Sequence, residues 1–415
     1  MSIVAVFFQS STRRAIALIA LQFLLTIGVT YWIFPHYERW HAFDLQHYHN
    51  ISVSIRQGLV PYRDFLLEYP PASLIPILLP QLFSGHEPLA SGDYAFGFVA
   101  ENLVFAVLLA LGLLGIAPRR GVSTLTKYTL LAMLLSPLLP WRYDLFPTLL
   151  TVAAVLATMS GFAVGSGIAL GLGIAAKLYP VVLVPVFFLY FVASRRVGMG
   201  VKLGVSAIAT TLLTFLPFWW LAPDDFTSFL TYHKDRGLQI ESVYAGLVSL
   251  GDVLGLTEAS SEMNYGAQHL ISPLSEPLLQ LQPWLFVVAM AAVYGLAWWR
   301  FREESQRFTE ISVETLVVYS TAALLAFMLT NKVFSPQYLI WLLAFLPLLR
   351  WRFVAVAAVS FAMTMTFSFI TRQLRLMYPP SVVLLNLRNF LLLGVLLWLL
   401  VSFSPFQWRQ KFQRD

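Results

Sequence analysis

The sequence predicts an all-α integral membrane protein. Of its 415 residues, 58% are hydrophobic and only 12% are charged, whereas a soluble protein has about 25% charged residues. The mean hydropathy is +0.72, and apolar runs long enough to cross a bilayer recur along the chain. The chain has no cysteine, which excludes disulfides, thiolate metal sites and cysteine nucleophiles.

We expect a bundle of about twelve transmembrane helices. The first apolar run follows Arg13 and Arg14, but it is too long for a signal peptide and no small-residue cleavage site follows it, so it is expected to remain as a helix. Several runs are short, which predicts broken or tilted helices. The expected spans cover residues 15–34, 93–117, 126–140, 145–160, 162–176, 178–194, 201–222, 283–300, 313–331, 335–349, 352–371 and 382–404.

Basic residues set the expected orientation. They gather in short segments such as Arg119-Arg120 and Arg195-Arg196, which favours a cytoplasmic side and places both termini there. Because these short segments are spread along the chain between apolar runs, they argue against a nucleic-acid partner despite the net charge of +6. The apolar run 71–82 is too short to span and is expected to lie at the interface. We therefore predict a single domain over 1–415 with two structured outer loops, 35–92 and 223–282, that contain interfacial helices.

The polar clusters fall at the predicted outer ends of the helices. Each mixes aromatic residues with at least one charge, which suggests an outward-facing cavity that holds an anion beside apolar surface. A lipid-linked phosphate fits this description, because Arg and Lys bind phosphate. The clusters are HAFDLQHYHN (41–50), PYRDFLLEYPP (61–71), PWRYDLFP (140–147), AAKLYP (175–180), YHKDRGLQIES (232–242), NKVFSPQY (331–338) and TRQLRLMYPP (371–380).

The order of these motifs resembles glycosyltransferase family 87. The matching pattern is D…G-x-x-P-Y-x-D…E-Y-P-P, R-x-D-x-x-P, K-x-Y-P, R-G-L-Q-x-E-S and N-K-x-x-S-P-Q-Y, over about residues 40–340. The resemblance implies a GT-C fold, a mannosyltransferase-like activity at the cell membrane and a sugar donor carried on polyprenyl phosphate. It further implies transfer with inversion, on the outer face, to an acceptor hydroxyl of a glycan or glycolipid.

The resemblance assigns the general base to a carboxylate in the first outer loop, which here is Asp44. A carboxylate within hydrogen-bond reach of the acceptor hydroxyl suits this task, although a loop or helix-capping acid is the plainer interpretation. Asp44 also lies among His41, His47 and His49, ligand types that suit zinc or manganese. Solvated loop histidines are the commoner explanation, so we expect no cofactor and no metal.

Four cations are candidates for binding the donor phosphate. Lys177 interrupts an apolar stretch, where a cation is costly unless it is paired or functional; the alternative is that it reaches the interface. Arg236 and Lys332 lie in outer loops. Arg142 precedes Asp144 in a tight turn, where the two are either a mutual brace or part of the donor site.

A further set of residues is expected to bind substrate or to brace the site. For Arg63, Asp64 and Glu68, the alternative is an ion pair that only fixes the loop. For Gln337, the alternative is helix capping or packing within the bundle. The set comprises Arg63, Asp64, Glu68, Tyr69, Asp144, Tyr179, Glu241 and Gln337.

Two other functions compete with sugar transfer from polyprenyl phosphate. A flippase or transporter of lipid-linked glycans would place ionisable groups near the bilayer midplane and show similar halves, and this chain shows neither. A ligase or polymerase that uses diphosphate-linked donors would also need outer arginines, and only the order of the motifs argues against it.

Overall fold

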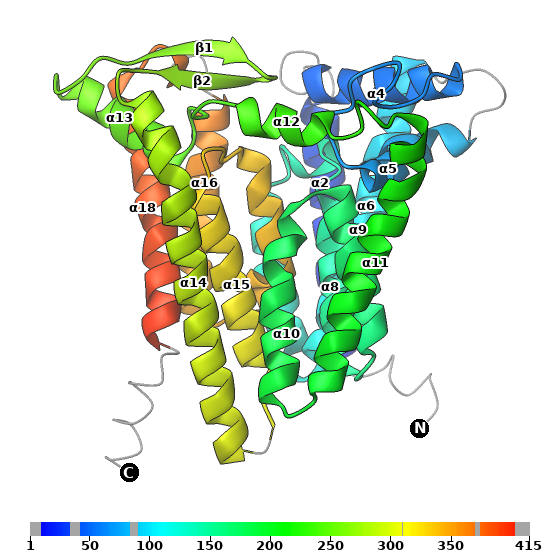
Figure 1. Ribbon diagram of the computed structural model, residues 1–415. Coiled ribbons are helices and arrows are strands. Elements are labelled where there is room, and N and C mark those ends of the chain that lie inside the picture. The colour runs from blue at the N-terminus through cyan, green and yellow to red at the C-terminus, as the bar shows by residue number, and fades with distance from the viewer. Residues whose placement is uncertain (1–9, 34–41, 84–89, 309, 370–373, 403–415) are drawn as a thin grey trace. The chain divides into compact units, whose positions relative to one another are not determined.

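The computed structural model describes residues 10–33, 42–83, 90–308, 310–369 and 374–402, and helices dominate it (Figure 1). By length and apolar composition, six described helices could cross a bilayer. These six segments are Arg13–Trp32, Ser91–Ile116, Val197–Leu221, Ser275–Phe308, Val313–Thr330 and Pro379–Ser402. The predicted class of helical membrane protein is therefore confirmed, whereas the number of twelve spans stays a prediction.

The chain forms two compact units. Unit 1 comprises Met1–Val181, Lys202–Thr231 and Leu346–Leu348, and unit 2 comprises Val182–Val201, Tyr232–Phe345 and Leu349–Asp415. The chain passes between the units within the 3-10 helix η6 (Tyr179–Leu183) and within the helices α11 (Val197–Leu221) and α12 (Ser228–Asp235).

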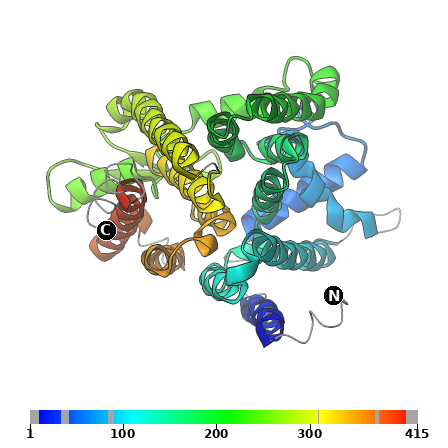
Figure 2. The same cartoon turned by 90° about the horizontal axis from the view of Figure 1, so that it is seen from below.

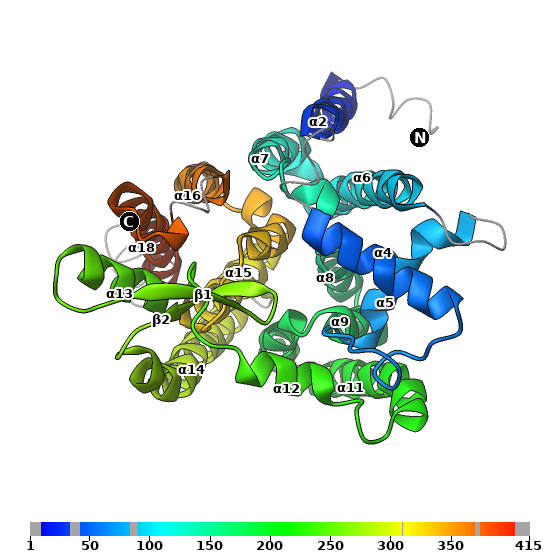
Figure 3. The same cartoon turned by 90° about the horizontal axis from the view of Figure 1, so that it is seen from above.

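Unit 1 contains the first half of the helices. They are α2 (Ser10–Ile33), α4 (Ala42–Arg56), η2 (Pro71–Ser73), α5 (Leu74–Leu78), η3 (Leu79–Phe83), α6 (Ser91–Ile116), η4 (Pro118–Arg120), α7 (Gly121–Leu134), η5 (Leu139–Trp141), α8 (Leu145–Met159), α9 (Ala163–Ala176) and η8 (Leu346–Leu348). The α4 and α5 helices lie at one end of α6, α8 and α9 (Figures 1 and 3). The run predicted to lie at the interface is short and consists of η2, α5 and η3 in succession.

Aromatic side chains hold α4 and α5 against this end of unit 1. Tyr48, Phe98 and Trp141 are buried, and the Tyr94 hydroxyl donates a hydrogen bond of 2.8 Å to the carbonyl of Ile77 in α5. Burying large rings contributes much apolar area, so this core fixes the α4 helix, on which Asp44 lies.

The α9 and α11 helices approach closely at two glycines. A Cβ atom on Gly167 would lie 1.9 Å from Ser206 Oγ and 2.3 Å from the carbonyl oxygen of Leu203. At Gly171 the Thr211 hydroxyl donates a 3.2 Å hydrogen bond to the backbone carbonyl. Small residues at this spacing are typical of close contacts between membrane helices.

Gly167→Ala is expected to destabilise the protein by about 1–3 kcal/mol, because the added methyl group overpacks this contact. Gly204→Ala, in α11, is the matched control: a Cβ there meets no atom within 4 Å, and alanine favours a helix over glycine. In detergent, the melting temperature should therefore fall for Gly167→Ala and rise for Gly204→Ala. Equal melting temperatures would contradict the close contact.

Unit 2 contains the second half of the helices and a β-hairpin. Its elements are α10 (Val184–Ala193), α13 (Val243–Val253), β1 (Ser260–Asn264), β2 (Ala267–Ile271), α14 (Ser275–Phe308), α15 (Val313–Thr330), η7 (Pro336–Ala344), α16 (Trp351–Phe369) and α18 (Pro379–Ser402). The α14 and α15 helices lie side by side, as do α16 and α18 (Figure 2). The hairpin and α13 lie at the end of these helices where α14 begins (Figures 1 and 3).

Two segments differ from the sequence expectation. The run 335–349 was expected to be a membrane-spanning helix, and it forms the 3-10 helices η7 and η8. The predicted outer loop 223–282 contains a hairpin as well as helices, with Tyr265 and Gly266 at positive φ angles of 47° and 66° in its turn. Two such residues match the twist of paired strands, which explains why Asn264-Tyr265-Gly266 turns the chain here.

Candidate active site

The α4 helix positions Asp44 in its first turn, where the partial positive charge of the helix N-terminus favours a carboxylate. Its Oδ2 atom lies 2.6 Å from Nη1 of Arg142, and the Asp44 side chain remains 29% exposed. The predicted base is therefore ion-paired, and solvent still reaches it.

A tight turn before α8 positions Arg142 and Asp144. Arg142 follows η5 in an extended conformation, and Asp144 immediately precedes α8. Asp144 is fully buried, and Nζ of Lys177 donates hydrogen bonds of 2.7 Å to both of its carboxylate oxygens. In place of the mutual brace that was one of the two alternatives, the structure has two pairs: Arg142 contacts Asp44, and Asp144 contacts Lys177.

Lys177 reaches Asp144 because α9 ends at Ala176 and the backbone of Lys177 is extended. Its side chain is 15% exposed, and the ammonium lies 4.6 Å from the centre of the Tyr143 ring. Burial lowers the pKa of Lys177, and the Asp144 carboxylate opposes this shift. Lys177 is therefore a paired cation and not one that extends toward the interface.

Three tyrosine rings line the same part of unit 1. Tyr48, Tyr69 and Tyr143 contact each other edge to face, with ring centres 5.2–6.0 Å apart. Burial raises the pKa of Tyr48 and Tyr69, and Asp44 adds to both shifts. The charged side chains of Asp44, Arg142, Asp144 and Lys177 thus lie beside buried aromatic rings. The low dielectric constant of such surroundings strengthens the interactions between charges.

Arg142 shows the balance of these effects. Burial disfavours its charge, but Asp44, Tyr48, Tyr69 and Asp144 together raise its pKa. Arg142 therefore stays cationic beside Asp44.

The loop before η2 is held by local contacts. Arg63 donates two hydrogen bonds of 2.9 Å to Asp64, and Asp64 also accepts one of 2.7 Å from the backbone of Val60. The bond to Arg63 lowers the pKa of Asp64 to about 2. This geometry agrees with the bracing alternative for Arg63 and Asp64.

Glu68, Tyr69 and Tyr179 occupy different settings. Glu68 lies 3.8 Å from Nε2 of His47 in α4, which brings it near the predicted base. The hydroxyl of Tyr179 lies within 3.5 Å of the hydroxyls of Thr148 and Thr151 on α8. Tyr179 thus packs α8 against the chain that follows Lys177.

In unit 2 the motif 236–242 forms backbone contacts with β2 on one side and with the segment that contains Lys332 on the other. The backbone of Gln239 pairs with that of His269 on β2, and its N–H donates a 3.0 Å bond to the carbonyl of Lys332. Backbone hydrogen bonding therefore links the segments that carry the expected phosphate ligands Arg236 and Lys332.

The charges of this segment influence each other. Burial and then Arg236 lower the pKa of Lys332, whose Nζ donates to the carbonyl of Lys234. Burial raises the pKa of Glu241, against the opposing effect of Arg388. Arg388 also donates a 2.8 Å bond to the backbone carbonyl of Glu241.

Sequence reasoning did not select His269, Gln239 or Arg388. His269 lies on the unexpected hairpin, and Arg388 is fully buried within the last apolar run. A cation inside a spanning run was the one available signal for Arg388. Gln337, which was selected, instead accepts a 2.6 Å hydrogen bond from Ser335 at the start of η7.

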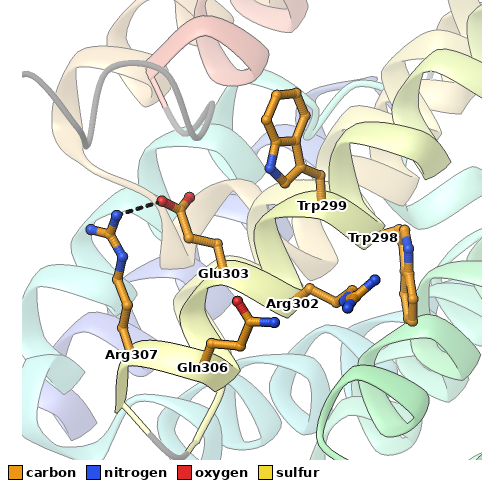
Figure 4. Close-up of a pocket in the computed structure, with 6 residues that line it drawn as sticks. All are labelled: Trp298, Trp299, Arg302, Glu303, Gln306 and Arg307. Carbon is orange, nitrogen blue, oxygen red and sulfur yellow. Dashed lines mark ion pairs between the residues drawn. The ribbon is translucent and has the colours of Figure 1, made fainter.

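The described residues contain no group of three or more histidine, aspartate or glutamate side chains placed to hold a metal ion. His41 of the considered metal cluster lies outside the described residues. A hollow of about 490 Å³ is lined by the C-terminal part of α14, including Trp298, Arg302 and the Glu303–Arg307 ion pair (Figure 4). It contains none of the predicted site residues.

The model of glycosyltransferase family 87 matches residues 65–327. The chain belongs to glycosyltransferase family 87. It is therefore a glycosyltransferase, and its apolar helices make it a membrane protein. No curated protein matches the chain. Of the predicted site of this family 87 enzyme, the match includes Arg142, Lys177 and Arg236, whereas Asp44 and Lys332 lie outside it.

Proposed function

We propose that this family 87 enzyme transfers a hexose such as mannose from polyprenyl phosphate to an acceptor hydroxyl. The acceptor is a glycan or glycolipid on the outer face of the membrane, and the reaction inverts the anomeric centre. Asp44 is the general base. The observation that carries the proposal is the pairing of a partly exposed Asp44 with a buried Arg142, which positions one carboxylate and leaves it accessible.

The proposed step is a direct displacement. The acceptor oxygen attacks the anomeric carbon from the side opposite the phosphate, and a new glycosidic bond forms. The bond from that carbon to the phosphate oxygen breaks, and its electron pair leaves with the polyprenyl phosphate. Asp44 takes the hydroxyl proton. Because phosphate is a good leaving group, no general acid is assigned.

Arg236 and Lys332 are proposed to bind the donor phosphate. Both lie in unit 2, where burial and then Arg236 lower the pKa of Lys332 and Asp235 only opposes this shift, so a bound anion would stabilise the two cations. The expectation that Arg142 and Lys177 bind phosphate stays a prediction, since both contact carboxylates in this structure.

Membership of family 87 leaves the transporter alternative without support. A donor carried on diphosphate is the remaining competitor, because arginine and lysine bind both anions.

The donor class can be tested with the purified protein in detergent. We expect transfer from polyprenyl-phosphate-mannose to a cell-envelope glycolipid extract, release of polyprenyl phosphate, and a product whose anomeric configuration is opposite to that of the donor. A parallel reaction contains a polyprenyl-diphosphate-linked sugar. Turnover only with the diphosphate donor, or retention of configuration, would contradict the proposal.

A further inference from the structure

The motif 236–242 and the hairpin of unit 2 present side chains on one common face. In antiparallel pairing, residues directly opposite each other project their side chains to the same side, and Gln239 is opposite His269. Backbone bonds from Ile240 to Gln268 (3.0 Å) and from Leu270 to Leu238 (2.8 Å) fix this register. The two side chains are thus positioned by backbone and not by flexible loops.

These side chains are buried and incompletely bonded. Gln239 and His269 are each only 4% exposed, yet Gln239 Oε1 and His269 Nε2 have no hydrogen-bond partner among the described residues. The same holds, within the described chain, for Glu241 Oε2 and Arg236 Nε. Buried polar atoms are normally paired, so four unpaired atoms in one segment indicate a ligand.

The chemistry of these atoms selects the ligand. A bare anion offers only acceptors, but Gln239 Oε1 and Glu241 Oε2 are themselves acceptors and need donors. Hydroxyl groups both donate and accept. Burial, with Arg236 and Lys332, lowers the pKa of His269 to about 4, so its ring is neutral near pH 7 and has one donor and one acceptor nitrogen.

The surroundings provide close backbone packing and an aromatic surface. Gly237 lies beside the imidazole, and a Cβ there would be 3.0 Å from His269 Nδ1. The Tyr265 ring lies 6.4 Å from His269 and 5.3 Å from Tyr232. Aromatic rings of this kind pack against the apolar faces of sugars.

We propose that Gln239, Glu241 and His269 bind the hydroxyls of the donor sugar, beside a phosphate held by Arg236 and Lys332. The ligand class is a sugar phosphate on a lipid carrier, and the three residues determine which sugar is accepted. This inference rests on the proposed function, and it adds that recognition of the sugar lies in the hairpin segment of unit 2.

The test compares binding of two lipids to the full chain in detergent: polyprenyl-phosphate-mannose and polyprenyl phosphate. The wild type should bind the sugar-bearing lipid more tightly. Gln239→Ala should lose about tenfold in affinity for that lipid, through a lost buried hydrogen bond, and keep its affinity for polyprenyl phosphate. Arg236→Ala should weaken both.

Gln268→Ala is the matched control, because Gln268 lies next to His269 on β2 and projects to the opposite face, where it contacts Met263. Gln239→Leu, which keeps the volume of the side chain, is measured beside Gln239→Ala in case the smaller residue prevents folding. Mannose 1-phosphate, the headgroup without the lipid, should compete with the lipid in the wild type and less in the Gln239 variants.

Two outcomes are decisive and distinct. If the Gln239 variants behave as Gln268→Ala does with both lipids, the sugar site is wrong while the proposed donor class stands. If the wild type binds neither lipid, the proposed donor itself is wrong, and this inference with it.

Discussion

Asp44→Asn is expected to reduce sugar transfer by about 100- to 10,000-fold, the usual contribution of a positioned base. Asparagine keeps the shape of the side chain and an oxygen for Arg142, but it cannot accept the proton from the acceptor. Binding of polyprenyl-phosphate-mannose should be largely unchanged, because the proposal assigns Asp44 no contact with the donor phosphate. Single-turnover transfer and donor binding, measured on the same preparation, separate the two effects.

Asp93→Asn provides the control for this loss. Asp93 is an exposed acid in the first turn of α6, in the same unit, and no role in the site is assigned to it. Its variant should retain wild-type transfer. If Asp44→Asn also retained it, Asp44 would be a structural partner of Arg142 and the base would have to be sought elsewhere.

Lys177→Met is expected to cost about 3–5 kcal/mol of folding stability, because it leaves the Asp144 carboxylate buried without its cation. The double variant Lys177→Met/Asp144→Leu removes both charges and should recover most of that loss, since apolar residues can replace a buried ion pair. Thermal unfolding of the single and double variants measures this difference.

The stable double variant also tests the expected phosphate role of Lys177. If the pair is structural, donor affinity in the double variant matches the wild type. A stable double variant that binds polyprenyl-phosphate-mannose more weakly, by about 1–3 kcal/mol, would assign Lys177 to the phosphate. A double variant as unstable as Lys177→Met would contradict the ion-pair interpretation.

Most helices were predictable because their apolar runs are long and the bilayer sets their length. The run 313–331 became α15, for example, and 93–117 became α6 within a few residues. The 3-10 form of 335–349 was not predictable, since composition does not distinguish two helical pitches. The hairpin had only a weak local signal at Asn264-Tyr265-Gly266, and its pairing with Gln239 depends on contacts that are distant in sequence.

For the site, the order of motifs selected Asp44, Arg142, Asp144 and Lys177, which the structure gathers in unit 1. It did not predict their partners. Arg142 and Asp144 are two positions apart, and a mutual brace was one of two alternatives for them, but the turn directs each to a different segment. His269 was missed because a lone histidine in an outer loop has no distinguishing pattern before the fold places it.

The 3-10 geometry of η7 affects how far this apolar stretch reaches. A 3-10 helix rises about 2.0 Å per residue, compared with about 1.5 Å in an α-helix. Residues Pro336–Ala344 therefore extend roughly a third farther along their axis than the same number of residues in α form. Each side chain of η7 thus lies farther from the next along the axis than in an α-helix of equal composition.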